Sequence, residues 1–366
     1  MRTIYLAAGA RPNFMKIAPL VRALRAHGFL AFRIVHTGQH YDRDMSDVFF
    51  EELGIPAPDF YLEAGSGSHA KQTARIMVAF EEVCRRERPD CVLVVGDVNS
   101  TLACSIVAKK MHIPVAHVEA GLRSGDLRMP EEINRLVTDA IADWFFVTEP
   151  SGMANLLREG KSPDRVFHVG NVMIDNLIYQ RDRLSDMDLS RFESTALKRH
   201  IERYGVVTLH RPSNVDNPAT FKGIAAALAQ ISEQLPLIFP VHPRTRVNLR
   251  QFGIDLGERV FLTKPLSYID FLNLWKDATL ILTDSGGLQE ESTALGVPCF
   301  TIRENTERPV TVNEGTNVLV GTNTGRIVHE VDKVLGCDGR QMRRCPALWD
   351  GKSANRVVEI LNAVLS

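Results

Sequence analysis

The sequence has no long hydrophobic run and almost no net charge. No apolar stretch approaches the roughly 18 residues that a membrane-spanning helix needs. Its 43 Lys and Arg residues nearly balance its 44 Asp and Glu residues, which leaves a net charge of -1. Because such a balance attracts neither nucleic acid nor an anionic membrane, we expect no partner of either kind, and any anion site must be local.

Closely spaced cysteine pairs are also lacking. The six cysteines are scattered, without the short spacings of zinc sites or redox motifs, and several lie in apolar stretches where a thiol acts as a small hydrophobe. The opening residues lack the small-residue cleavage site of a secretory signal. These absences indicate a cytoplasmic protein with reduced cysteines.

What the sequence does contain is an alternation of short apolar runs with longer amphipathic stretches. Such alternation predicts an α/β protein whose parallel sheet has helices on both faces. In the first half, the predicted strands are Ile4–Ala8, Phe32–His36, Cys91–Val95 and Val115–Val118, and the helices are Phe14–Ala26, Ala70–Cys84 and Leu102–Lys110.

The alternation restarts in the second half, and 366 residues suit two domains. Its predicted strands are Val206–Leu209, Leu237–Val241, Val260–Leu262 and Leu280–Thr283, and its helices are Phe221–Gln234, Leu288–Leu295 and Ala354–Leu365, the last with Ser353 as N-cap. We expect Rossmann-like domains over residues 1–170 and 171–352, doubly wound and facing across a cleft lined by strand ends.

Two segments favour phosphate binding. Gly9-Ala10-Arg11-Pro12-Asn13 follows the first strand, with Lys16 one helical turn later, so that free amides and two cations converge at a helix start. Ser285-Gly286-Gly287 follows a strand in the second half, and its glycines let helix amides approach an anion, with Glu291 in the next turn. The first segment taken alone is equally compatible with a basic pair beside a surface turn. For the second segment the alternative, a helix cap with glycines for close packing, is the weaker interpretation because the glycines lie between a strand and a helix.

Carboxylates follow strands or open helices in the first half. Asp97 and Glu119 each come just after a predicted strand, and Glu131 opens a helix behind Pro130. One such residue is most often a cap or an ion-pair partner. Three at the same edge of a sheet indicate acid–base chemistry, because clustered carboxylates titrate at separated pKa values.

Further polar residues follow strands of the second half. His210 and His242 each end a strand, where a histidine suits phosphate contact or proton transfer, although a satisfied core histidine is the commoner case. Arg308 lies in a loop and is suited to bidentate phosphate binding.

Taken in order, these segments resemble the non-hydrolysing UDP-N-acetylglucosamine 2-epimerases over essentially the whole chain. The motifs that carry the resemblance are Gly9-Ala10-Arg11-Pro12, Thr37-Gly38-Gln39-His40, Gly96-Asp97, His117-Val118-Glu119-Ala120-Gly121-Leu122-Arg123, Pro130-Glu131-Glu132-Ile133-Asn134-Arg135, Leu209-His210-Arg211, Asp284-Ser285-Gly286-Gly287-Leu288-Gln289-Glu290-Glu291 and Thr306-Glu307-Arg308-Pro309.

The resemblance implies a glycosyltransferase-B fold, in which the C-terminal helix, residues 353–366, packs on the first domain. It implies a homodimer that needs no metal and no cofactor. It assigns catalysis to Asp97, Glu119, Glu131 and His210. It assigns substrate binding to Arg11, Lys16, His242, Phe271, Ser285, Gly286, Gly287, Glu291 and Arg308.

The implied reaction interconverts UDP-N-acetylglucosamine and UDP-N-acetylmannosamine through elimination and re-addition of UDP, for surface polysaccharide synthesis. One related branch epimerises a UDP-2,3-diacetamido uronic acid, and Arg128 is a candidate partner for the carboxylate of that sugar. Another branch releases UDP by hydrolysis. A glycosyltransferase of the same fold and a non-catalytic nucleotide-sugar sensor are the alternatives from other classes.

Overall fold

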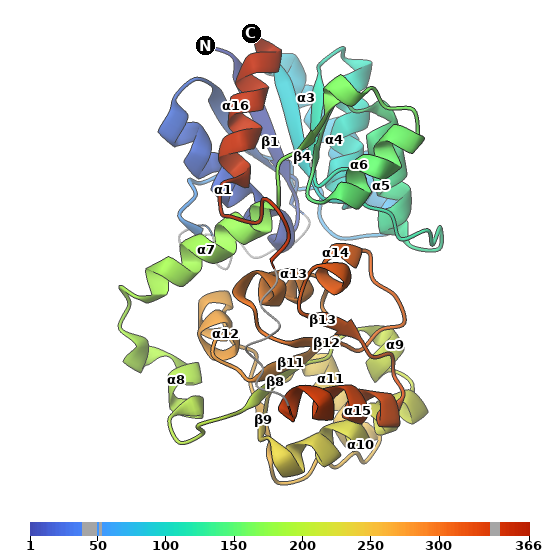
Figure 1. Cartoon of the computed structure of the whole chain (residues 1–366). Helices are drawn as coiled ribbons and strands as arrows, with labels where there is room; N and C mark the ends of the chain where they lie inside the picture. Colours follow the sequence, from blue (N-terminus) through green and yellow to red (C-terminus); the bar gives the residue numbers. More distant parts are fainter. Residues whose placement is uncertain (39–49, 51–52, 337–344) are drawn as a thin grey trace. The chain divides into compact units, whose positions relative to one another are not determined.

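The computed structural model describes residues 1–38, 50, 53–336 and 345–366, traced in chain order in Figure 1. It divides into two compact units, the first comprising Met1–Asn176 with Ala347–Ser366 and the second Leu177–Pro346. The division falls within helix α7 (Val172–Leu184), whereas the sequence predicted a boundary near residue 170.

Unit 1 is built on a seven-stranded parallel sheet. Its strands, in spatial order, are β3 (Phe60–Tyr61), β2 (Ala31–His36), β1 (Thr3–Ala8), β4 (Cys91–Val95), β5 (Val115–Val118), β6 (Trp144–Val147) and β7 (Val166–His168). Every residue of β4 and β5 is buried, as expected for strands covered on both faces. The strand order reverses between β1 and β4, so the loops after these strands diverge there.

The helices of unit 1 cover this sheet. They are α1 (Arg11–His27), α3 (His69–Arg86), α4 (Asn99–Lys110), α5 (Pro130–Ile141), α6 (Pro150–Arg158), the short η1 (Pro163–Arg165) and α16 (Ser353–Leu365). One core cluster joins Phe80 of α3, Cys104 of α4 and Leu156 of α6 to Tyr5 and Val92 of the strands.

The last helix of the chain packs beside the first one, as Figure 1 shows for α16 and α1. The buried carboxylate of Asp175 accepts hydrogen bonds from the amides of Ser353 (3.1 Å) and Ala354 (2.6 Å). The prediction that Ser353 is the N-cap was wrong, because Lys352 holds that position and Asp175 satisfies the free amides.

Unit 2 repeats the same topology with six parallel strands. They are, in spatial order, β10 (Val260–Thr263), β9 (Leu237–Pro240), β8 (Gly205–Thr208), β11 (Leu280–Thr283), β12 (Cys299–Thr301) and β13 (Asn317–Leu319). The helices are α8 (Glu193–Lys198), α9 (Pro212–Val215), α10 (Pro218–Gln234), α11 (Pro243–Gln251), α12 (Tyr268–Trp275), α13 (Gly286–Leu295), α14 (Pro309–Asn313) and α15 (Thr324–Leu335), with η2 (Leu189–Arg191) before them. Two doubly wound sheets confirm the predicted α/β class.

The core of unit 2 explains why these amphipathic stretches form helices. Phe221 and Leu228 of α10 pack with Ile327 and Val331 of α15 over the apolar strands, and all four side chains are fully buried. Within the described residues, none of the helices is both long enough and apolar enough to span a membrane.

Candidate functional site

Ligands of doubly wound sheets bind beyond the carboxyl ends of the strands, where the strand order reverses. In unit 1 this point lies between β1 and β4, and Lys16 and Asp97 follow these strands. In unit 2 it lies between β8 and β11, which His210 and Ser285 follow. The sequence-predicted residues therefore form one group in each unit.

Glu119 is held in an unusual backbone conformation directly after β5. Its φ is 70°, a left-handed value that costs a non-glycine residue on the order of 1 kcal/mol. Its carboxylate forms a buried ion pair with Lys16, which α1 presents one turn after its start. Gly96, with φ of 67°, leaves room for this ammonium, since a Cβ there would lie 2.9 Å from Lys16 Nζ. A buried carboxylate and a cation are thus placed together at the end of the sheet.

Asp97 has a different environment. Arg135 of α5 donates from Nε to Asp97 Oδ2 at 3.0 Å and also pairs with Glu132. Glu132 accepts from the amides of Ser124 and Gly125, and although its burial favours the neutral acid, these bonds and Arg135 lower its pKa. Glu132 is therefore a fixed structural anion, while the Asp97 side chain stays 25% exposed and accessible to a ligand.

A cavity of about 490 Å³ in unit 1 brings two of the predicted carboxylates together. Asp97 and the exposed Glu131 line it, whereas Glu119 is not among its lining residues. The remaining lining residues are Ser66, Gly67, His69, Gln72, Val98, Asn99, Pro130 and Asn134.

Several polar groups of this cavity were not predicted as site residues from the sequence. Asn99 donates to Gln72 Oε1 at 2.7 Å and lies within hydrogen-bonding distance of His69, and Asn134 donates to the Asp97 carbonyl at 2.8 Å. Such amide groups suit the hydroxyl and acetamido groups of a sugar. Asn99 is the first residue of α4, whose N-cap is Val98. In the sequence, the only sign of His69 and Gln72 as site residues is their place at the start of helix α3, just after its N-cap Ser68.

Unit 2 offers a helix start suited to an anion. Helix α13 begins at Gly286, one residue after Ser285, and a Cβ on Gly287 would meet no atom within 4 Å. This first turn is partly exposed, and the first amides of a helix have no partner within the helix, which suits a phosphate. The site prediction for Ser285, Gly286 and Gly287 remains a prediction, since it concerns a bound ligand.

Asp284 connects this helix start to His210. Its fully buried carboxylate accepts from the backbone amides of His210 (3.1 Å) and Arg211 (2.9 Å) and from Asn214 Nδ2 (3.1 Å). His210 Nδ1 lies 3.1 Å from Asp284 Oδ1, with its side chain 47% exposed. Asp284 thus fixes the loop after β8 against the loop after β11.

Arg308 lies next to the same helix start but already has anionic partners. Its Nε is 3.0 Å from Glu290 Oε2, and its guanidinium donates to Glu307 Oε1 at 2.7 Å. Burial works against ionisation of Glu307, yet Arg308 and Arg303 lower its pKa to about 2. A phosphate bound by Arg308 must therefore share the guanidinium with these carboxylates.

Glu291 is buried on α13 and accepts a hydrogen bond of 2.8 Å from the Tyr268 hydroxyl of α12. Burial raises the pKa of Glu291 to about 7. The hydrogen bond from Tyr268 opposes this rise, and the charge of Glu290 adds to it.

Two further predicted binding residues belong to α12 and α11. Phe271 lies three residues after Tyr268 on α12 and is half-buried. His242 is exposed and caps α11, its Nδ1 accepting from the amide of Arg244 at 3.3 Å.

Some predicted residues fall outside the described structure. The side chain of Arg11, which opens α1, is not described, and neither are Gln39 and His40. The described cysteines at positions 84, 91, 104 and 299 are buried free thiols. In the described ranges, no three His, Cys, Asp or Glu side chains cluster in a way that could hold a metal ion.

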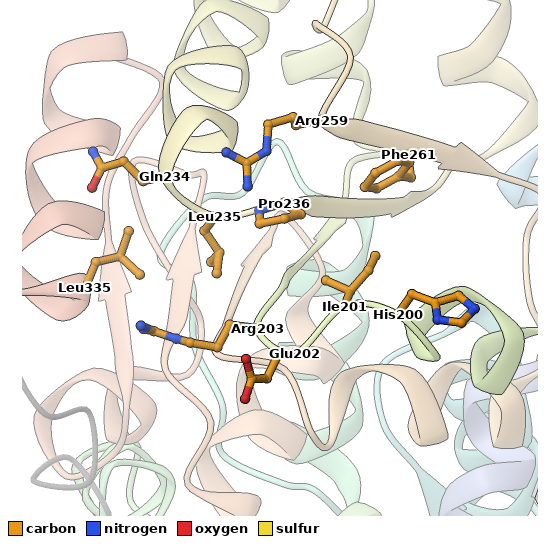
Figure 2. A pocket seen from close by; sticks show the side chains of 10 residues that line it. All are labelled: His200, Ile201, Glu202, Arg203, Gln234, Leu235, Pro236, Arg259, Phe261 and Leu335. Carbon is orange, nitrogen blue, oxygen red and sulfur yellow. The ribbon is translucent and has the colours of Figure 1, made fainter.

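A second cavity, of about 480 Å³, lies at the amino ends of β8, β9 and β10 (Figure 2). Figure 2 shows Arg203, Arg259 and Phe261 among its lining side chains. It lies at the edge of the unit 2 sheet opposite to Ser285 and His210, and no predicted site residue lines it. Because ligands of doubly wound sheets bind at the carboxyl ends of the strands, this cavity is not part of the candidate site.

Both units have the architecture of nucleotide-binding α/β proteins, and in unit 1 the carboxylates of Asp97 and Glu131 line one cavity. The chain belongs to the UDP-N-acetylglucosamine 2-epimerase family, whose family model matches residues 22–362, and it is an isomerase. The family and the fold class predicted from the sequence are confirmed.

Similar proteins cover nearly the whole chain. A UDP-N-acetylglucosamine 2-epimerase of Methanocaldococcus jannaschii is 41% identical over 96% of this chain and 97% of its own. The UDP-2,3-diacetamido-2,3-dideoxy-D-glucuronate 2-epimerase of Pseudomonas aeruginosa is 40% identical over the same shares. A crystal structure of the M. jannaschii enzyme with UDP-GlcNAc and UDP superposes with a TM-score of 0.87 over 99% of this chain and 100% of that one.

Proposed function

We propose that this protein interconverts UDP-N-acetylglucosamine and UDP-N-acetylmannosamine by inverting carbon 2 of the sugar. The observation that carries the proposal is the arrangement in unit 1, where Asp97 and Glu131 line one cavity and Glu119 is paired with Lys16. A glycosyltransferase needs one catalytic base at most, and a sensor needs none.

The chemistry requires several ionisable groups because the C2 proton is very weakly acidic. Breaking the bond between C1 and the diphosphate oxygen builds positive charge at C1, and this acidifies C2. A carboxylate then takes the proton as UDP leaves in an anti elimination, which gives 2-acetamidoglucal and UDP. An acid on the opposite face returns a proton to C2 while UDP adds to C1 in a syn addition, so atoms and charge balance.

Unit 2 would hold the nucleotide. The partly exposed helix start at Ser285, Gly286 and Gly287 suits the diphosphate, and Glu291 suits the ribose hydroxyls. The remaining roles follow the sequence prediction, which gives substrate binding to Arg11, Lys16, His242, Phe271 and Arg308 and a catalytic role to His210.

A second candidate substrate is a UDP-2,3-diacetamido uronic acid, because the P. aeruginosa relative named for that sugar is as similar as those named for UDP-N-acetylglucosamine. The basic residue considered for its carboxylate, Arg128, is 91% exposed and already pairs with Asp126 at 2.8 Å. This pairing favours the neutral sugar.

Proton NMR of the purified protein with each UDP-sugar tests these assignments. We expect the UDP-N-acetylglucosamine signals to give way to an equilibrium mixture with UDP-N-acetylmannosamine. Turnover of the uronate alone would reassign the substrate, and free N-acetylmannosamine with UDP would show a hydrolysing enzyme. Asp97→Asn should abolish the conversion while leaving the fold intact.

We also propose a cytoplasmic homodimer that needs neither metal nor cofactor and supplies surface polysaccharide synthesis. Sedimentation should give twice the chain mass, and activity should persist in a chelator. A monomer with full activity, or loss of activity with EDTA that added metal restores, would contradict these points.

A further inference from the structure

A buried histidine and aspartate of unit 1 have no place in the reaction described above. His117 of β5 and Asp139 of α5 are both fully buried, and Nδ1 of the ring lies 2.6 Å from Asp139 Oδ1. The other ring nitrogen, Nε2, lies 2.9 Å from the carbonyl oxygen of Gly96. Both nitrogens thus face oxygen atoms of the protein interior.

The partners determine how many protons the ring carries. The Gly96 carbonyl can only accept, so Nε2 must carry a hydrogen. Asp139 Oδ2 accepts a hydrogen bond from the Gly121 amide at 3.0 Å and pairs with Arg123 at 2.8 Å. Burial opposes ionisation of Asp139, but His117 and Arg123 lower its pKa. An ionised Asp139 accepts at Oδ1 as well, which places a second hydrogen on Nδ1 and makes the ring an imidazolium.

These hydrogen bonds end on the two loops that carry carboxylates. Gly96 directly precedes Asp97, and Glu119 lies between His117 and Gly121. The ring therefore holds the peptide before Asp97, and Asp139 holds the amide two residues after Glu119. Glu119 has a left-handed φ of 70°, which is strained in a residue other than glycine, so the loop that carries it needs support to keep its conformation.

We propose that His117 and Asp139 are positioning residues that fix Asp97 and Glu119 relative to each other through a doubly protonated, buried imidazole ring. The role assigned to Asp97 and Glu119 rests on the proposed function, but the state of the ring does not. The pair takes no part in proton transfer with the substrate. It determines where the groups that do so are placed, and a misplacement of about 1 Å can cost about 100-fold in rate.

Two variants of His117 separate its two hydrogen bonds. The amide nitrogen of His117→Gln can replace Nε2 and retain the bond to Gly96, whereas that of His117→Asn can replace only Nδ1. We expect His117→Asn and Asp139→Asn to lower kcat about 10- to 100-fold with KM within about twofold, and His117→Gln to recover part of the loss. Asp175→Asn, which alters another buried carboxylate of unit 1 that caps α16, should lower Tm and leave kcat unchanged.

The ring itself can be observed without any activity. In ¹⁵N-labelled wild-type protein at neutral pH, we expect one histidine with both ring nitrogens protonated and with hydrogens that exchange slowly with solvent. A neutral ring, or wild-type kcat in folded His117→Asn, would overturn the proposal. If the wild-type enzyme epimerises no UDP-sugar, the proposed function fails, while the NMR result still decides the state of the ring.

Discussion

At the residue scale, Glu119 is the carboxylate whose surroundings differ most from those of an ordinary surface acid. It combines burial, a left-handed backbone and a lysine partner, whereas Asp97 pairs with an arginine at the border of a cavity. Strain and buried charge together are expected where function requires a fixed group. We therefore expect substitution of Glu119 to lower kcat far more than substitution of an acid in the same unit that only stabilises the fold.

Glu119→Gln should lower kcat by about 10²- to 10⁴-fold, the range for loss of a proton-transfer group, with unchanged UDP affinity. Asp143→Asn is the matched control, because Asp143 is also paired with a lysine, Lys109 at 2.7 Å, but lies at the amino end of β6. Steady-state kinetics and UDP titration measure both variants. Equal losses in the two would show that Glu119 only stabilises the fold.

The buried Glu291 predicts a pH dependence of stability. Its pKa is about 7 in the folded protein against 4.5 ordinarily, so between these values the folded state binds a proton that the unfolded state has lost. The contribution of Glu291 to stability therefore falls as pH rises from 4.5 to 7, by about 3 kcal/mol in total, and is constant above.

Urea denaturation of wild type and Glu291→Gln at pH values from 5 to 8 measures this contribution. The stability of the wild type relative to the variant should decrease as pH rises from 5 to about 7 and stay constant from there to pH 8. A constant difference would show that Glu291 is ionised in the folded protein throughout.

At the scale of elements, the loop after β5 is fixed by a close backbone contact with the start of α6. Gly121 has φ of 79°, and a Cβ there would lie 2.3 Å from the carbonyl oxygen of Gly152. Gly121→Ala should destabilise the protein by about 3 kcal/mol, through strain and overlap together. Gly125→Ala, where φ is 72° and no atom lies within 4 Å, should cost only about 1 kcal/mol. Thermal unfolding of the pair measures the difference, and equal costs would show that the loop can relax.

The sequence predicted elements best where burial is complete. The limits of β4, β5 and β11 were predicted to the residue, because fully buried parallel strands are uninterrupted apolar runs. Helices α1 and α4 begin three residues earlier than predicted, since their first turns are polar or contain proline. The short strands β3, β7 and β13 were missed, because two or three residues show no periodicity.

The candidate site was predictable only in part for a related reason. Residues that follow strands, such as Asp97, Glu119 and Ser285, are marked by their place in the alternation of elements. Their supporting partners Arg135 and Asp139 lie on the interior face of α5, where spacing along the chain gives no sign of a contact. Such partners emerge only when the fold brings the elements together.

At the scale of the whole molecule, one chain contains two doubly wound sheets with different side chains at their strand ends. Unit 1 supplies carboxylates and a lysine, and unit 2 supplies a partly exposed helix start and a buried glutamate. The division matches the two needs of the proposed reaction, which are proton transfer at C2 and stabilisation of departing UDP. The proposed function therefore requires that the C2 proton exchanges with solvent during turnover.

Incubation of the protein with UDP-N-acetylglucosamine in heavy water tests this exchange. We expect the H2 signal of the sugar to disappear as deuterium enters C2 of both UDP-N-acetylglucosamine and UDP-N-acetylmannosamine. Complete retention of the C2 proton after prolonged incubation with active protein would contradict it.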